Sequence, residues 1–148
     1  MMSYVGQLLL VGLLIVACND SATELPTGGV GGTEAKLVDV TVRRGEQVTV
    51  PGTALRIGLV DVTDDGRCPA RDVEGNPILC VWQGNANLLL ALSEPGREPV
   101  VDVLESGFDP EVAFGAFRIR FFGLSPERIE GAEIEPAKYV ATLRVVTP

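Results

Sequence analysis

From Lys36 to the C-terminus, hydrophobic and polar residues alternate with a period of two. The alternation is clearest in four stretches: 38–42, 47–50, 117–121 and 139–145. A period of two is typical of a strand that buries one face and exposes the other to solvent. A longer run, 55–62, changes parity in its middle, which predicts a β-bulge near Gly58 or Leu59.

The segment 86–92, ANLLLAL, is apolar on both faces apart from Asn87, and it is therefore predicted to be a central strand. Turn signals such as Arg44-Gly45 and Pro95-Gly96 separate the hydrophobic runs. No stretch has the pattern of a long amphipathic helix, and only 126–136 is expected to hold a short helical turn, starting at its first Pro. Residues 36–148 are thus predicted to form one all-β domain, an antiparallel β-sandwich or open barrel of about seven or eight short strands.

The first 19 residues carry no charged side chain and form a region of their own. Residues 5–17, VGQLLLVGLLIVA, are too few to span a bilayer, which takes about 20 residues, but they fit the apolar region of a secretory signal peptide. The polar, Gly-rich segment 19–35 has the composition of a flexible linker, which would span about 20–25 Å.

Residues 15–18, IVAC, resemble the lipobox of bacterial lipoproteins, in which an aliphatic residue lies three positions before the Cys and a small residue just before it. The resemblance implies cleavage after Ala17 and lipidation of Cys18. Two or more acyl chains on one cysteine give the stable membrane anchoring that a single chain does not. Asn19 stands where an Asp would retain such a protein in the inner membrane, so the resemblance favours an outer-membrane anchor facing the periplasm.

These predictions divide the chain into three parts. Residues 1–17 are a lipoprotein signal peptide, 18–35 are the lipidated Cys with its linker, and 36–148 are the β domain. With Cys18 assigned to lipid, Cys68 and Cys80 remain in a chain exported to an oxidising compartment, and we expect one disulfide between them. The loop-entropy model assigns about 3 kcal/mol to a loop of this length.

The residues that follow the second cysteine of this pair also carry expectations. Cys80 and Trp82 are two positions apart and share a face if they lie on a strand. Trp82 is therefore predicted to be a structural core residue beside the disulfide, and Gly84 to mark a bulge or bend.

The segments 64–69, DDGRCP, and 79–90, LCVWQGNANLLL, are similar to a pattern found in a group of uncharacterised bacterial lipoproteins. In that pattern, Asp-Ser-Arg-Cys-Pro is followed by a short loop and then by Cys-Val-Trp-Ala-Gly-Glu-Ala. The first hairpin, RRGEQVTV, and the closing strand, YVATLRV, fit as well, so the resemblance covers most of 36–148. This chain has Gly66, Gln83 and Asn85 where the pattern has Ser, Ala and Glu. The resemblance implies no activity, because none is known for the group.

Charge and composition narrow the class of function. Twelve Lys and Arg against 20 Asp and Glu give a net charge of −8, which argues against nucleic acid and against docking on anionic lipid. The chain has no His, which excludes Ser-His-Asp triads, Cys-His pairs and His-ligated zinc sites. We therefore expect no enzyme and no cofactor. The sequence instead predicts an envelope lipoprotein that acts as a binding or structural module, held to the membrane through Cys18 and partnered by another envelope protein.

Three other interpretations stay open. Acidic side chains around the first cysteine of the pair are candidate calcium ligands, although their spacing is not that of an EF-hand: Asp64, Asp65, Asp72 and Glu74. The disulfide loop is also typical of protease inhibitors and other ligand-binding modules, with Arg67 or Arg71 as the side chain presented to a protease. Finally, Arg118 and Arg120 share one strand face, and with Arg144 they predict a stripe that binds an anion or a partner.

Overall fold

The computed structural model describes residues 35–107 and 110–148. The chain divides into two units, Met1–Gly32 and Thr33–Pro148, and the described residues belong to the second unit. The predicted signal peptide, Cys18 and the linker up to residue 34 lie outside the described residues. The second unit is built of antiparallel strands, which confirms the predicted all-β fold.

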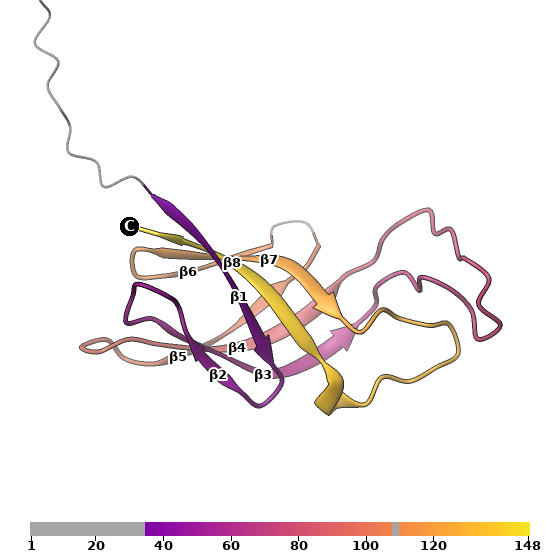
Figure 1. Cartoon of the computed structure of the whole chain (residues 1–148), viewed down its shortest axis with the longest axis horizontal. Helices are drawn as coiled ribbons and strands as arrows, with labels where there is room; N and C mark the ends of the chain where they lie inside the picture. Colours follow the sequence, from indigo (N-terminus) through magenta and orange to yellow (C-terminus); the bar gives the residue numbers. More distant parts are fainter. Residues whose placement is uncertain (1–34, 108–109) are drawn as a thin grey trace, which may run out of the picture. The chain divides into compact units, whose positions relative to one another are not determined.

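The described strands form two four-stranded sheets that pack face to face as a sandwich (Figure 1). The first sheet has the order β1-β8-β7-β6, with β1 at Lys36–Arg43, β8 at Val140–Thr147, β7 at Phe117–Ser125 and β6 at Glu111–Phe114. The second has the order β2-β3-β4-β5, with β2 at Gln47–Thr49, β3 at Arg56–Asp65, β4 at Ala86–Ser93 and β5 at Val100–Glu105. A single turn of 3-10 helix, η1 at Pro136–Lys138, precedes β8.

The core lies between the two sheets, and in β4 and β8 it is built from alternate residues of the strand. In β4, Leu88, Leu90 and Leu92 are buried, and the residues between them are half-buried on the outer face. In β8, Leu143 and Val145 are buried in the same hydrophobic cluster. The strand β4 lies between β3 and β5, which confirms the prediction that 86–92 is a central strand.

Irregularities in pairing explain where the sequence pattern changes. The register of β3 against β4 shifts between Leu59 and Asp61, which confirms the predicted bulge, and it shifts again between Val62 and Asp64. The helical turn expected to start at Pro126 is wrong: the backbone of Arg128 and Glu130 pairs with the disulfide loop, and the 3-10 turn starts only at Pro136.

The strand β5 forms one edge of the second sheet. Its apolar residues Val100, Val101 and Val103 are exposed, and Asp102 Oδ1 accepts a hydrogen bond from the backbone N–H of Val103 at 2.8 Å. This outward-facing backbone N–H is thereby occupied, which removes one site at which another strand would pair.

The two ends of the sandwich differ in the length of their loops. At one end, Lys36 pairs with Thr147, and the chain enters the domain there. Two long loops, 66–85 and 126–139, extend from the opposite end, where Asp65 and Ser125 close their strands (Figure 1). We call these two loops together the loop lobe.

Candidate functional site

The disulfide lies inside the loop lobe. Cys68 and Cys80 are bonded, with their Cα atoms 6.0 Å apart, which confirms the predicted pair. The loop that they close is also paired along its backbone with the second loop of the lobe. The N–H of Ala70 donates to the carbonyl of Arg128 at 2.9 Å, and the N–H of Glu130 donates to the carbonyl of Arg71 at 2.9 Å. Covalent and hydrogen bonds therefore hold the two loops together.

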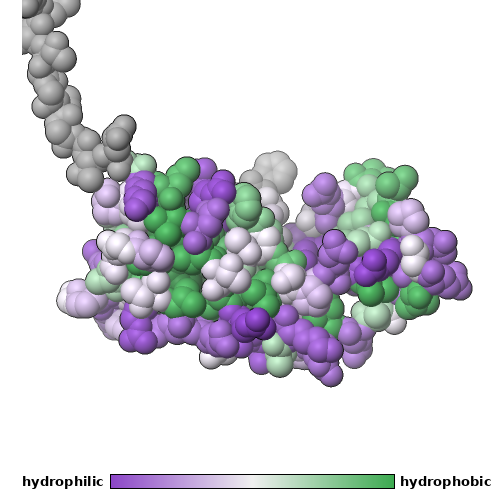
Figure 2. All heavy atoms as spheres, viewed as in Figure 1, coloured by the Kyte–Doolittle hydropathy of each residue, from purple (hydrophilic) through white to green (hydrophobic). Residues whose placement is uncertain are grey.

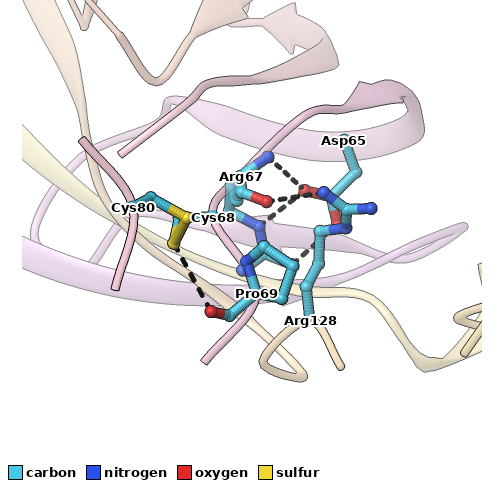
Figure 3. Close-up of a disulfide and its surroundings, with 6 residues drawn as sticks. All are labelled: Asp65, Arg67, Cys68, Pro69, Cys80 and Arg128. Carbon is cyan, nitrogen blue, oxygen red and sulfur yellow. Dashed lines mark hydrogen bonds and ion pairs between the residues drawn. A yellow bond between two sulfur atoms is a disulfide. The ribbon is translucent and has the colours of Figure 1, made fainter. Parts of the chain in front are cut away.

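A largely buried ion pair lies beside the disulfide (Figure 3). Arg67 Nε contacts Asp65 Oδ1 at 2.7 Å and Arg67 Nη2 contacts Asp65 Oδ2 at 2.8 Å, so the pair is bidentate. The same guanidinium donates to the backbone carbonyls of Leu124 and Pro126, while Arg128 Nη1 donates to the carbonyl of Arg67 at 2.6 Å. Arg67 thereby ties the end of β3 to the loop that follows β7.

Tyr139 completes this network from the start of β8. Its hydroxyl donates to Asp65 Oδ2 at 3.0 Å. Burial, together with the adjacent Asp65 carboxylate, raises the pKa of Tyr139 to about 12. Burial also acts to raise the pKa of Asp65, but the hydrogen bonds and charge of Arg67, with the Tyr139 hydroxyl, outweigh it and hold that pKa below its usual value. At neutral pH the network therefore consists of a charged pair and a neutral tyrosine.

Two residues of the lipoprotein-like motif have a structural role in this network. Asp65 and Arg67 are the Asp and Arg of the segment DDGRCP, and both side chains are committed to contacts within the lobe. Arg67 is therefore not free to enter a protease pocket. The Arg71 side chain is exposed, although its backbone carbonyl is bonded to Glu130.

Trp82 does not lie in the core, and the prediction that placed it there is wrong. The side chain is 71% exposed, and its neighbours Val81 and Leu79 are fully or almost fully exposed. The alternation between Cys80 and Trp82 does not apply, because β4 begins only at Ala86 and the residues before it form a loop. Figure 2 shows hydrophobic side chains at the surface of the lobe.

Gly84 makes the bend that presents these residues. Its φ is +69°, and a Cβ at this position would lie 1.9 Å from the carbonyl oxygen of Gly66. Only glycine fits such a close approach at a positive φ, which confirms the predicted bend. The chain therefore leaves Trp82 outside the sandwich and enters β4 in a different direction.

Two adjoining hollows lie beside the exposed residues. One has a volume of about 500 Å³, and its lining includes Val81, Trp82 and Glu105. The other has a volume of about 640 Å³, and its lining includes Leu79 and Glu127. Both hollows share Gln83, Gly84 and Ser106, and we call them together the loop groove.

The sequence did not point to Glu105, Ser106 or Glu127, which belong to no motif. Ser106 reaches the groove through pairing with β4: the N–H of Ala86 donates to Ser106 Oγ at 2.7 Å, and the N–H of Ser106 donates to the carbonyl of Ala86 at 2.8 Å. This pairing brings the end of β5 next to the loop that carries Trp82, and no local signal in the chain indicates it.

The candidate calcium ligands are not brought together. Asp65 is held by Arg67, as described above. Asp72 accepts hydrogen bonds from the side chain of Asn76 and from the backbone of Asn76 and Glu74, which lower its pKa. Glu74 lies beside Asp72, since both carboxylates accept from Asn76 Nδ2, but in 35–107 and 110–148 no three potential metal ligands gather at one place.

The three arginines of the predicted stripe do lie together on the outer face of the first sheet. Arg120 is the register partner of Arg144, and Arg118 is on the same face of β7. Each is already paired with an acid. Arg118 and Arg120 both contact Glu111, and Arg144 Nε contacts Asp39 Oδ1 at 2.7 Å, which lowers the pKa of Asp39. The charge of this stripe is therefore largely balanced.

No known protein family, no curated protein and no solved structure matches this chain. In the part of the chain that the structure describes, no helix has the length and hydropathy needed to cross a membrane.

Proposed function

We propose that this protein is a membrane-anchored envelope lipoprotein whose folded domain is a non-catalytic binding module, and that the loop groove is its binding surface. The observation that carries the proposal is the exposure of Leu79, Val81 and Trp82 beside a groove. Large apolar side chains that gather at a surface are typical of interaction sites, and tryptophan is enriched among the residues that contribute most to binding.

The way in which the loop is held supports a binding role. The disulfide, the bidentate Asp65–Arg67 pair and the backbone bonds to the second loop hold the exposed residues in place before any partner arrives. A preordered loop loses less conformational entropy on binding than a flexible one. Because these bonds order the loop, Leu79, Val81 and Trp82 can stay exposed. None of these three side chains is needed for the hydrophobic core.

The position of the anchor also fits this arrangement. The proposed lipid is on Cys18, and the chain enters the domain at Lys36, at the end opposite the loop lobe. A tether at that end leaves the groove accessible to a partner in the envelope. The absence of His from the sequence favours binding over nucleophilic or acid–base catalysis.

Site-specific photo-crosslinking in cells that express the protein tests the binding role. A photoreactive residue in place of Val81 is expected to give a discrete crosslinked product, identified by mass spectrometry. The matched control is the same residue in place of Ala113, which is exposed on the outer face of the first sheet. Equal products from both positions, or none from Val81, would contradict a binding surface at the groove.

Mass spectrometry of the mature protein tests the anchor separately. We expect loss of residues 1–17 and the added mass of acyl chains on Cys18. A Cys18→Ser variant should be neither acylated nor retained in the membrane fraction. An unprocessed N-terminus in the wild type would refute the proposed anchor.

A further inference from the structure

We infer that the loop groove binds a positively charged segment of a partner polypeptide, with a lysine or arginine side chain held between Trp82 and Glu105. This inference rests on the proposed function and adds the chemistry of the partner. The inference is supported by the composition of the groove lining and by the row of polar side chains next to the groove.

The lining of the groove combines an exposed aromatic ring with carboxylates that have no internal counter-charge. Trp82 and Glu105 line the same hollow of about 500 Å³, and Glu127 lines the adjoining one. Among the described residues, no Lys or Arg forms an ion pair with Glu105 or Glu127. The guanidinium groups of the loop lobe beside the disulfide, Arg67 and Arg128, are occupied by Asp65 and by backbone carbonyls. The negative charge of the groove is therefore available to a ligand.

A row of hydrogen-bond acceptors crosses the outer face of the second sheet at the same end. Asp64, Asn87 and Glu105 are register partners across β3, β4 and β5, so their side chains are neighbours. Asp64 is exposed and, within the described residues, forms no ion pair. Asn87 Oδ1 is the one buried side-chain oxygen or nitrogen of the described residues that lacks a hydrogen-bond partner. That oxygen is closed off from solvent, so the groups open to a ligand are the exposed carboxylates of Asp64 and Glu105 on either side of it, and both add negative charge next to the groove.

The chemistry of the groove suits an organic cation better than a metal ion. In the described chain no three potential metal ligands gather at one place, whereas an exposed indole attracts a lysine or arginine side chain through its ring face. The groove also extends beyond the reach of one side chain. Its second hollow is lined by an apolar residue, Leu79, by the Glu127 carboxylate, and by Arg67, whose guanidinium is bound to Asp65. A polypeptide in which basic and apolar residues alternate matches both hollows, and the net charge of −8 would attract it.

Trp82 is the only tryptophan of the chain, so its fluorescence reports on the groove directly. The probe is a hexapeptide of alternating lysine and leucine with blocked ends, and the control probe replaces each lysine with glutamate. We expect the lysine peptide to change the emission of Trp82 in a saturable way and to lose affinity as salt is added, since salt screens exposed charges. Binding of the glutamate peptide with equal affinity would overturn the inference.

Two variants locate the cation. Glu105→Gln is expected to weaken binding of the lysine peptide about fivefold, and so is Trp82→Ala, followed by anisotropy of a labelled peptide. The matched control is Glu98→Gln, which removes the same charge from an exposed residue that precedes β5, away from the groove, and should leave the affinity unchanged. An equal loss in Glu98→Gln would show that only net charge matters and would refute the site. Should Trp82→Ala fail to fold, the comparison of Glu105→Gln with Glu98→Gln decides.

Different results would refute the binding function of the groove and the cationic nature of its partner. A crosslinked partner at Val81, together with lysine-peptide binding that does not depend on Glu105, would leave the binding function in place and refute the cationic partner. Lysine-peptide binding that depends on Glu105, with no crosslinked partner in cells, would support the chemistry of the groove and count against the proposed function in the envelope.

Discussion

In the sandwich, most strands direct apolar side chains into one shared core, whereas the loop lobe places Leu79, Val81 and Trp82 on its surface. The sandwich is stabilised mainly by apolar burial. The lobe is stabilised by a disulfide, a bidentate ion pair and backbone hydrogen bonds between its two loops. The lobe is therefore ordered without burying these three side chains. Those side chains are free to contact something else.

Truncation of a core leucine tests the stabilisation of the sandwich by apolar burial and should have the largest effect on the free energy of unfolding. Leu90 of β4 is completely buried, so Leu90→Ala is expected to lower the free energy of unfolding by about 4 kcal/mol, through lost burial and a residual cavity. The control is Leu89→Ala, on the half-buried outer face of the same strand, which should cost less than half as much. Chemical denaturation measures both, and equal costs would contradict the assignment of the two faces.

The ion pair of the lobe should be nearly as sensitive. Asp65→Asn leaves the Arg67 guanidinium largely buried with only carbonyl acceptors, and we expect a loss of about 3 kcal/mol. The matched control is Glu94→Gln, whose partner Arg97 is half exposed, and its cost should stay within about 0.5 kcal/mol. A mild effect of Asp65→Asn in thermal or chemical unfolding would show that the network does not hold the lobe.

Removal of the disulfide should lower the local stability of the loop lobe more than that of the sandwich. In the Cys68→Ser/Cys80→Ser double variant we expect a loss of at most about 3 kcal/mol in global stability. Hydrogen exchange should show the amides of Ala70 and Ile78 opening locally while those of β4 still exchange only by global unfolding. Protection of the lobe amides equal to that of β4 would contradict the view that the disulfide is a main support of the lobe.

High pH should weaken the network through Tyr139. Its pKa in the folded protein, about 12, lies above its unfolded value near 10, so the neutral hydroxyl stabilises the fold. That contribution is present in full below pH 10 and is lost as the pH rises towards 12; it amounts to roughly 2 kcal/mol. Denaturation between pH 8 and pH 12 should show this loss in the wild type. Tyr139→Phe should lack it, having already lost the hydrogen bond to Asp65 at pH 8.

The smallest effect on stability is expected for the residue that the sequence placed in the core. Trp82 is mostly exposed, so Trp82→Ala should change the unfolding free energy by no more than about 0.5 kcal/mol. The buried Phe117 gives the contrast, and Phe117→Ala should cost about 3 kcal/mol. A loss at Trp82 similar to that at Phe117 would restore a core role for the tryptophan.

The strands were predictable wherever burial alternates along the chain, because that pattern is local. The run 86–92, apolar on both faces, located β4 as a central strand, and the change of parity in 55–62 located the bulge in β3. The alternation did not reveal β5, since Val100, Val101 and Val103 are exposed and leave no clean contrast between two faces. The same rule failed for Trp82, because the parity of a strand has no meaning in the loop that precedes β4.

The disulfide and the Gly84 bend were also predictable, the first from the count of cysteines and the second from a glycine beside an apolar run. The groove was not. It depends on pairing between β4 and β5, which brings Glu105 and Ser106 to Trp82 across more than 20 positions of sequence. Nor does the sequence show that Asp65 and Arg67 face each other, because that contact follows from the way in which the loop turns after β3.

The pairing of the first and last strands has a consequence for how the protein is made. β1 has β8 as its sheet partner, and β8 is also the neighbour of β7, so the first sheet lacks its middle until Val140–Thr147 has been synthesised. Synthesis proceeds from the N-terminus, and until β8 is released the apolar faces of β1 and β7 are exposed. A chain that stops short of Val140 would also lack Tyr139 or leave it unplaced. The strand β8 and the Tyr139 before it are therefore needed to close both the first sheet and the network at the loop lobe.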